Sequence, residues 1–386
     1  MARSAPKKSV QQSDTRDESA SPESQLGDYL KKNEDDHLDF TTAVNYSVST
    51  GSLGLDIETG GLRPGAHRVG GGPNLGKTPF ALNIIDNFLD TVPNSRAIWC
   101  KSEGRLSPEN LARVRHPVVF NFNEWKTGTI YVFRCNIYDT WIGLMRELIT
   151  DNPNDIRYGF VTDSLDALNL KNDITKAIAE GTKVAGGALL TKQLFQKMGL
   201  AMSERGHLKI FIGQRTADIN INPYAPGQPR QTNGSGGNGL AHFANEAFQF
   251  EEIYEGNLIL KDPTAKIDRV SNPAIGHILK VKLKKASKEK RFITVEVPIR
   301  YGQVGGASIW REREVGDLML TWGLVSKGGT WLTLTPAFIS EVEKQGITGL
   351  PEKVQGMNQL YALLDERKDL TDYLFAKFKA MASGTT

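Results

Sequence analysis

A glycine-rich stretch at residues 69–85, VGGGPNLGKTPFALNII, constrains the fold of this chain more than any other segment. It contains Gly71-x-x-x-x-Gly76-Lys77-Thr78, the complete phosphate-loop pattern in which a tight turn joins a strand to a helix. Glycine lets the backbone approach an anion closely, and the loop N–H groups and the helix N-terminus attract phosphate oxygens. The alternative is a glycine-rich turn that only joins strand to helix, but the full pattern is much rarer than isolated glycines.

Each residue of this motif has an expected role. Lys77 would reach the terminal phosphates of a nucleotide, and the Thr78 hydroxyl would ligate Mg²⁺. Pro79 is compatible with the first helical turn, where its missing N–H has no intrahelical partner to lose. The preceding segment AHRV is short and only partly apolar, which is weak for a buried parallel strand. The expected cofactor-binding residues are Gly71, Gly72, Pro73, Asn74, Leu75, Gly76, Lys77, Thr78 and Pro79.

Length, net charge, cysteine content and the lengths of the apolar runs limit what kind of protein this chain can be. The 386 residues can form one large core and a smaller domain, and the net charge of +3 means that a polyanion must be bound by a local patch. The two cysteines, Cys100 and Cys135, lack metal-ligand spacing and indicate a reducing compartment. Without an apolar run of membrane-spanning length or a signal-peptide core, we expect a cytoplasmic protein, in the host cytoplasm if it is viral.

The pattern of apolar residues divides the chain into three parts. Residues 1–36 are polar and predict a disordered or partly helical arm, with a short helix near SQLGDYLKK. Residues 37–306 alternate strand and helix, which predicts an α/β core with a mostly parallel sheet. The late segments HILKVKLKK and RFITVEVPIRYG alternate with period two and predict an antiparallel extension of that sheet. Residues 307–386 are expected to form a small C-terminal α/β domain.

A phosphate loop that hydrolyses its ligand needs a metal carboxylate, a base for the attacking water and a sensor of the γ-phosphate. Asp163 ends the apolar strand GFVTD, at the sheet edge where α/β proteins bind ligands, and could hold Mg²⁺. Its alternative role is to cap the next helix. Glu103 follows AIWCKS at the same edge and could polarise water, or be a solvent-facing loop residue. Gln214 ends the strand KIFIG and precedes a long Pro/Gly/Asn-rich loop that it could order or release.

The densest basic run is LKVKLKKASKEKR. Lysines of this kind commonly protect a solvated edge strand. They could also face phosphate, either of DNA or of a nucleotide held by a neighbouring subunit, and their spacing does not choose between these readings.

Taken in order, these segments resemble the ATPase core of the RecA/UvsX recombinases. STGSLGLDI and GGLRPG resemble the entry to that core, SEGRLSP its catalytic-glutamate segment, VTDSLDAL its Walker B strand and IGQRTADI its glutamine switch. GSGGNGLAHFA is similar to the end of the second DNA-binding loop, LKVKLKK to a segment with two lysines that reach the neighbouring subunit's ATP, and IRYGQVG to the close of the core. The resemblance covers roughly residues 45–325.

This resemblance implies a helical filament on single-stranded DNA, with ATP and Mg²⁺ between subunits and strand exchange with homologous duplex DNA. Glu103 would be the catalytic base, Asp163 the metal carboxylate and Gln214 the switch. Lys282 and Lys284 would stabilise transition-state charge from the next subunit. DNA would lie against loops 171–187 and 217–237. The candidate DNA-binding residues are Arg215, Arg230, Asn233, Gly236, Gly237 and Asn238.

The chain also departs from the family pattern. An aromatic that stacks on adenine commonly follows the catalytic glutamate, and Asn110 is nearby instead, so the adenine contact stays open. The lack of an acidic C-terminal tail and the divergent N-terminus favour a bacteriophage-type recombinase, with single-strand-binding and mediator proteins as further partners. Two other functions stay open: a hexameric replicative helicase with the same core, and a non-catalytic nucleotide-binding paralogue that assists a recombinase.

Overall fold

The computed structural model describes residues 22–32, 44–174, 186–217, 232–234, 240, 242–286 and 293–383. The chain divides into two units, Met1–Thr42 and Ala43–Thr386. In the first unit the described part is one helix, α1 (Pro22–Lys32), over the segment in which we expect a short helix. The second unit contains all the other elements. Among the described helices none is long and apolar enough to cross a lipid bilayer.

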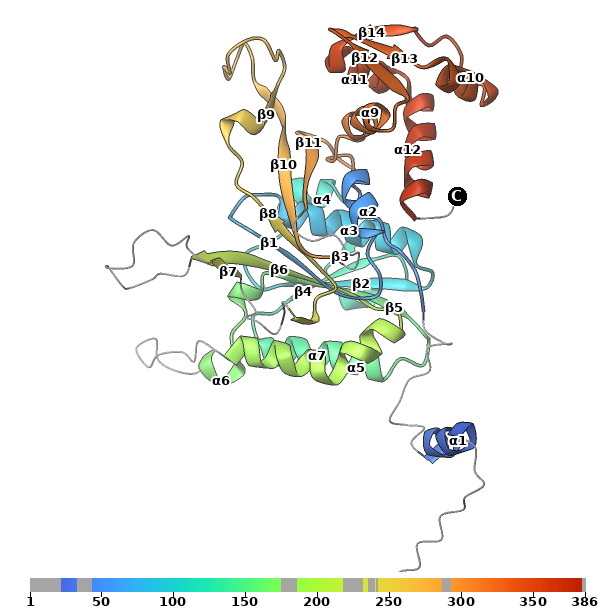
Figure 1. The fold of residues 1–386 in the computed structure, drawn as a ribbon. Helices are drawn as coiled ribbons and strands as arrows, with labels where there is room; N and C mark the ends of the chain where they lie inside the picture. Colours follow the sequence, from blue (N-terminus) through green and yellow to red (C-terminus); the bar gives the residue numbers. More distant parts are fainter. Residues whose placement is uncertain are drawn as a thin grey trace, which may run out of the picture. The chain divides into compact units, whose positions relative to one another are not determined.

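A large sheet forms the centre of the second unit (Figure 1). In the described residues its main path runs β11-β10-β8-β1-β6-β5-β2-β4-β3, with β7 added to β6 and β9 added to β10. The strands are β1 (Gly65–Gly71), β2 (Ser95–Lys101), β3 (Val118–Val119), β4 (Ile130–Arg134), β5 (Arg157–Asp163), β6 (Leu208–Ala217), β7 (Thr232–Gly234), β8 (Glu246–Phe250), β9 (Leu258–Leu260), β10 (Ala274–Lys285) and β11 (Thr294–Arg300).

The middle of the sheet is parallel, as the alternation of strands and helices predicted. Strands β8, β1, β6, β5, β2, β4 and β3 pair with one another in parallel, and β10 and β11 add the predicted antiparallel extension. The weakly apolar strand β1 lies between β6 and β8 and is largely buried. Within it His67 is opposite Glu246 of β8, and their side chains form a buried pair at 2.6 Å.

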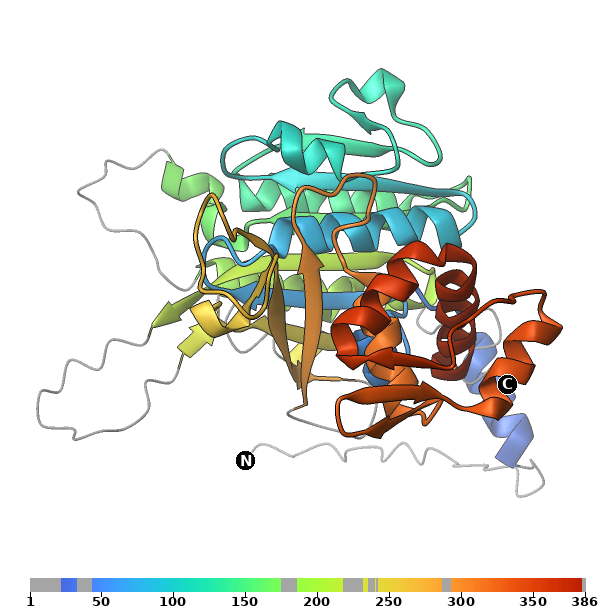
Figure 2. The ribbon, with the colours of Figure 1, turned by 90° about the horizontal axis from the view of Figure 1, so that it is seen from above.

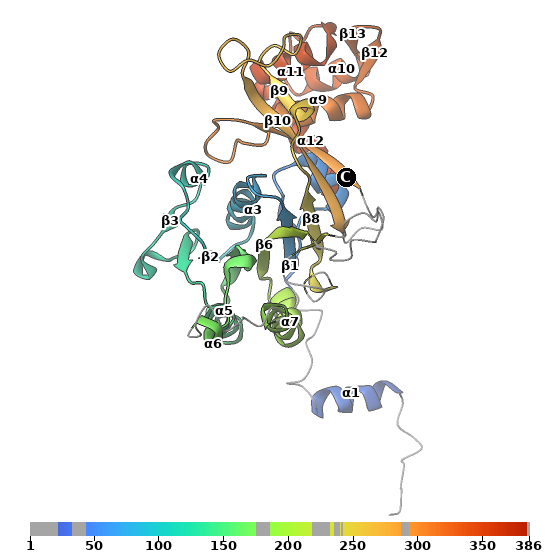
Figure 3. The same cartoon turned by 90° about the vertical axis from the view of Figure 1, so that its left-hand side faces the viewer.

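Helices cover both faces of the parallel sheet (Figure 3). Helix α3 (Lys77–Thr91) packs its apolar side on one face, where Phe88 and Ile85 contribute to a cluster with Val69, Trp99 and Val161. Helices α5 (Tyr138–Thr150) and α7 (Gly186–Glu204) cover the other face. Short helices are α2 (Leu53–Thr59), α4 (Pro108–Ala112) and α6 (Lys171–Ile174). This two-sided burial explains why β2 and β5 read as continuous apolar runs.

The C-terminal segment contains a second, three-stranded sheet (Figure 2, orange to red). Its elements are α9 (Arg311–Thr321), β12 (Val325–Gly328), β13 (Trp331–Leu334), α10 (Pro336–Lys344), β14 (Lys353–Gln355), α11 (Gly356–Glu366) and α12 (Lys368–Ser383). They share their own apolar cluster, which also takes in Leu53 of α2. Glu314 accepts hydrogen bonds from the Ser52 hydroxyl at 2.5 Å and the Leu53 N–H at 3.0 Å. A domain boundary at residues 306/307 stays a prediction.

Candidate active site

Four strands of the parallel sheet end at one edge, and the predicted catalytic and metal-binding residues lie at or near these strand ends. Gly71 at the end of β1 is in register with Gln214 of β6, and Lys101 at the end of β2 is in register with Asp163 of β5. Ligands of open α/β sheets bind at the carboxyl ends of the strands. This edge is therefore the candidate site.

The phosphate loop leaves β1 and turns tightly into α3. Gly76, the residue before the helix, has φ +83°, and Asn74 has φ +57°, both in the left-handed region. A Cβ added to Gly71 would lie 2.9 Å from the Cβ of Phe250, and one added to Gly72 would collide with the Glu252 carboxylate. The approach of Phe250 therefore requires glycine at position 71, whereas the flexible Glu252 side chain could move away from a Cβ at position 72.

Lys77 begins α3, and its side chain folds over the loop. Its ammonium donates to the carbonyl oxygens of Gly71, at 3.1 Å, and of Gly72. Burial lowers the pKa of Lys77 below its usual value, against the charges of Asp163 and its acidic neighbours, which raise it. A phosphate oxygen in the cradle could replace these carbonyls as the partner of the ammonium.

The Asp163 carboxylate accepts hydrogen bonds from three side chains of the site. Its Oδ2 accepts from the Thr78 hydroxyl at 3.3 Å, from Trp99 Nε1 at 3.3 Å and from Lys101 Nζ at 2.7 Å. Because successive side chains alternate along a strand, Trp99 and Lys101 share one face of β2, and register places them beside Val161 and Asp163 of β5. Asp163 therefore faces the phosphate loop. Its hydrogen bonds come from these three side chains and not from the N–H groups of a helix that it would cap. No local sequence pattern points to Trp99 and Lys101, since only the register of β2 and β5 brings them here.

Glu103 lies on the loop after β2 and is exposed. Its Oε1 accepts a hydrogen bond of 2.9 Å from the Ser164 hydroxyl, and the Ser102 hydroxyl donates to the Ser164 carbonyl at 2.6 Å. The carboxylate is thus held beside Asp163 by the residue that follows it, with an oxygen open to solvent. Such a group can orient and deprotonate a water molecule.

Gln214 ends the buried part of β6 and is exposed. Its backbone N–H donates to Asp166 Oδ2 at 2.7 Å. Strand β6 continues to Ala217 and pairs with β7, so that Arg215 is opposite Gly234 and Thr216 opposite Asn233. The backbone that follows Gln214 is therefore continuous with the predicted second loop. Arg230, Gly236, Gly237 and Asn238 lie outside the described residues, as do most of loops 171–187 and 217–237.

Lys282 and Lys284 lie on β10, away from the chain's own cradle. Val281 and Leu283 of the same strand join the apolar cluster beneath α3, so Lys282 between them faces the opposite side of the sheet. The pairing of β10 with β8 shifts between Leu283 and Lys285, beside Lys284. Lys284 is exposed and Lys282 half-buried. The structure thus does not bring these two lysines together with Lys77 inside one chain.

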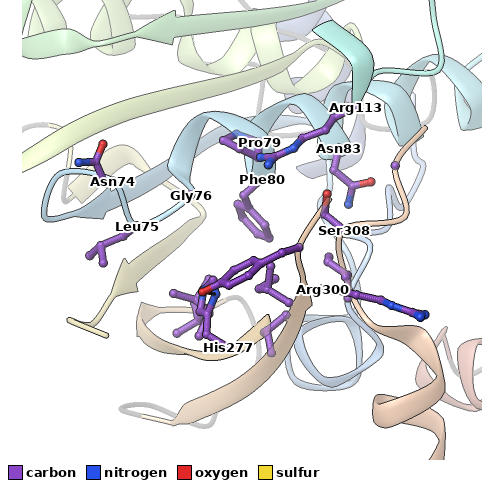
Figure 4. A pocket seen from close by; sticks show the side chains of 17 residues that line it. Asn74, Leu75, Gly76, Pro79, Phe80, Asn83, Arg113, His277, Arg300 and Ser308 are labelled. Carbon is purple, nitrogen blue, oxygen red and sulfur yellow. Dashed lines mark hydrogen bonds between the residues drawn. The ribbon is translucent and has the colours of Figure 1, made fainter. Parts of the chain in front are cut away.

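A pocket of about 220 Å³ adjoins the phosphate loop (Figure 4). Its walls come from residues 74–76, the start of α3, strands β10 and β11, and the loop after β11. Figure 4 shows Phe80 and His277 projecting into it from opposite sides. Tyr301 also lines it, and its hydroxyl lies 3.1 Å from His277 Nδ1. Four of the expected cofactor-binding residues, Asn74, Leu75, Gly76 and Pro79, line this pocket, whereas Tyr301 of the segment IRYGQVG was not among the expected site residues.

The oxygen ligands that the site offers suit a nucleotide with a bound metal ion. Mg²⁺ is usually held by one or two carboxylates together with substrate phosphates, and not by a cage of protein ligands. Asp163 and Thr78 supply an oxygen each beside the cradle. No cluster of three histidine, cysteine or acidic side chains suited to a metal occurs in the part of the chain that is described.

Comparison with known proteins adds a relationship over most of the chain, although no family model matches it. The RecA protein of Rickettsia massiliae is 24% identical over 344 residues, which cover 88% of each chain. The RecA protein of Frankia alni is 27% identical over 290 residues, covering 74% of this chain and 73% of its own. The chain is thus similar to bacterial RecA proteins over most of its length, at low identity. The RecA protein of Mycobacterium avium, 25% identical over 323 residues, covers 83% of this chain and 82% of its own.

The RecA relationship agrees with the fold. The mostly parallel sheet, its antiparallel extension and the helices on both faces form a RecA-like core. These RecA relatives are bacterial, so they lend no support to a bacteriophage origin.

Proposed function

We propose that this chain is an ATP-dependent recombinase of the RecA type, which forms a helical filament on single-stranded DNA and catalyses homologous pairing and strand exchange. The observation that carries the proposal is the convergence of Thr78, Asp163 and Glu103 beside the phosphate loop, in a chain related to RecA over most of its length. A loop that only joined strand to helix would need none of these three side chains.

The nucleotide site follows from the cradle and the adjoining pocket. The loop N–H groups of residues 71–76 and the start of α3 would bind the phosphates of ATP, with Lys77 moving from the loop carbonyls to the terminal phosphate. Thr78 and Asp163 would hold Mg²⁺, which neutralises charge that develops on the phosphates. The apolar pocket lined by Phe80 and Tyr301 would take the adenine. This pocket would replace the aromatic that is missing near Asn110.

Hydrolysis would use the residues at the ends of β2 and β5. Glu103, fixed by Ser164, would take a proton from the attacking water and orient it in line with the terminal phosphate. Lys282 and Lys284 would stabilise the transition-state charge of the neighbouring subunit's ATP, which agrees with Lys282 facing away from its own cradle. Subunits that contact one another head to tail, without closing into a ring, generate a filament.

DNA binding would be coupled to this chemistry through Gln214. Its side chain at the end of β6 would read the γ-phosphate and order the loop that follows. Arg215, Arg230 and the backbone of Asn233, Gly236, Gly237 and Asn238 would contact the phosphates of the DNA strand. The bases would stay free to test pairing, so that specificity comes from the partner strand.

The Lys101–Asp163 ion pair favours one second function. A lysine bound to the expected metal carboxylate could leave the site able to bind a nucleotide but unable to hydrolyse it, as in a non-catalytic paralogue that assists a recombinase. Purified protein would then bind ATP without DNA-stimulated turnover.

The test combines ATP hydrolysis with strand exchange between a circular single strand and a linear duplex. We expect hydrolysis stimulated by single-stranded DNA and joint products in wild type. We expect Lys77→Ala to lose turnover at least 100-fold while remaining folded, and Lys126→Ala, which removes an exposed lysine from the loop before β4, to behave like wild type. Turnover by Lys77→Ala at the wild-type rate would overturn the site. Closed rings that unwind forks would assign a helicase.

A further inference from the structure

Lys101 places a positive charge at the metal position of the candidate site. Its ammonium lies 2.7 Å from Asp163 Oδ2, and the side chains of Lys101 and Asp163 are only 11% and 4% exposed. Water screens such a pair weakly, so the attraction between the two charges is stronger than at the surface. Asp163 is therefore neutralised by a cation that belongs to the chain.

The ammonium binds the same oxygen that faces the phosphate loop. Asp163 Oδ2 also accepts from the Thr78 hydroxyl at 3.3 Å, and Thr78 is the other expected metal ligand. A divalent cation shared by Asp163 and Thr78 would have to lie against this oxygen. It would meet the Lys101 ammonium at close range, and the two cations would repel each other.

The pairing of β2 with β5 fixes the position of Lys101 beside Asp163. Lys101 and Asp163 are cross-strand neighbours of β2 and β5, and the ladder that pairs them runs over seven residues on each strand. Trp99 Nε1 donates a hydrogen bond of 3.3 Å to Asp163 Oδ2 and so orients the carboxylate. The flexible four-carbon stem of the lysine is the movable part, so the ammonium can leave the oxygen without a change in the sheet.

We propose that Lys101 is a tethered cation that competes with the divalent metal for Asp163, so that the metal binds this site well only together with the nucleotide phosphates. Without nucleotide, the lysine occupies the carboxylate and the free metal binds weakly. When phosphates enter the cradle, their negative charge attracts both cations, and Lys101 leaves Oδ2 to the metal. This inference rests on the proposed nucleotide site and adds to it a positioning residue that controls metal loading.

The test measures Mn²⁺ binding to the full-length protein without nucleotide, by the loss of the free-ion signal in electron paramagnetic resonance. Lys101→Met removes the competing charge and is expected to bind Mn²⁺ at least tenfold more tightly than wild type at the site. Lys101→Arg keeps the charge and is expected to stay within about threefold of wild type. The double variant Lys101→Met/Asp163→Asn is expected to lose the gain. Lys126→Met removes an exposed lysine and controls for the change in net charge.

Mn²⁺ affinity of Lys101→Met equal to or weaker than that of wild type would overturn the proposal, and so would a gain that survives Asp163→Asn. Should Lys101→Met fail to fold, Lys101→Gln carries the same expectation, because its amide can still donate to Asp163 without charge. Binding of the Mn²⁺–ATP complex, measured in parallel, tests the nucleotide site separately. Failure of every protein to bind that complex would refute the proposed function, whereas the comparison of free Mn²⁺ affinities would still decide the role of Lys101.

Discussion

Ser164 donates a hydrogen bond from its hydroxyl to Oε1 of Glu103 over 2.9 Å, and so links the end of β5 to the loop after β2. Ser164 directly follows Asp163 in the chain. The residue that would hold the metal and the residue that would activate water are therefore positioned by the same strand end. A shift of β5 against β2 would misplace both groups at once.

This link leads to a prediction for Glu103→Gln. The amide keeps the shape and can still pair with Ser164, but it cannot accept a proton from water. We expect ATP turnover to fall at least 100-fold, which is about the lower end of the effect of a general base, with ATP affinity within about threefold of wild type. Glu124→Gln, an exposed change elsewhere, is the control. The measurement is single-turnover hydrolysis beside equilibrium nucleotide binding, and unchanged turnover would exclude Glu103 as the base.

A second prediction concerns the pocket beside the phosphate loop. Tyr301 lines it and contacts His277. Stacking of a base on an aromatic ring contributes about 1–3 kcal/mol, so Tyr301→Ala should weaken ATP binding about tenfold. Tyr301→Phe keeps the ring and should bind within about twofold of wild type.

Inorganic triphosphate separates a base contact from damage to the phosphate loop. It has no base, so its affinity should be the same for wild type and Tyr301→Ala in calorimetric titrations. An equal loss for ATP and triphosphate would place the effect in the loop and not in an adenine site.

A third prediction tests whether the site is shared between subunits. Changing Lys282 and Lys284 together to alanine should abolish DNA-stimulated hydrolysis, although Lys282 faces away from the chain's own cradle. Mixing this variant with Glu103→Gln should partly restore hydrolysis, because some boundaries then combine an intact Glu103 with intact lysines. Turnover is measured over a series of mixing ratios. Activity that never exceeds the sum of the two separate variants would argue against a shared site.

A fourth prediction concerns pH and the contact between α2 and α9. Burial, with a smaller contribution from the Asp56 charge, raises the pKa of Glu314 from its ordinary 4.5 to about 7. The folded protein therefore binds this proton more tightly than the unfolded chain does. The stabilisation is complete below about pH 4.5 and is lost as the pH rises to about 7. Each pH unit between the two pKa values corresponds to about 1.4 kcal/mol, so the loss is about 3 kcal/mol.

Glu314→Gln stays neutral and should escape that loss. We expect its melting temperature, relative to that of wild type, to rise between pH 4.5 and pH 8, with the exposed change Glu366→Gln following wild type. Thermal unfolding followed by circular dichroism checks this. Parallel pH curves for wild type and Glu314→Gln would show that Glu314 does not titrate in this range.

Local patterns were enough to predict the scaffold of the site. The phosphate loop is a contiguous motif, and its roles follow from the chemistry of glycine, lysine and threonine. Asp163 and Gln214 end apolar strands, and parallel strands end at one edge of a sheet, so their neighbourhood could be inferred without coordinates. The antiparallel extension by β10 and β11 was likewise visible as period-two alternation.

Contacts between distant segments depended on strand order and register, which no local pattern contains. The weakly apolar strand β1 is central, and its His67 meets Glu246 of β8, a strand that no sequence pattern identified. No sequence pattern singled out Lys101, and the register of β2 and β5 places it beside Asp163. The sequence alone thus determined the groups of the phosphate loop and the polar side chains at the ends of the apolar strands. Only the tertiary structure decided which of them touch, because a one-residue shift in pairing would turn Lys101 and Trp99 to the other face of the sheet.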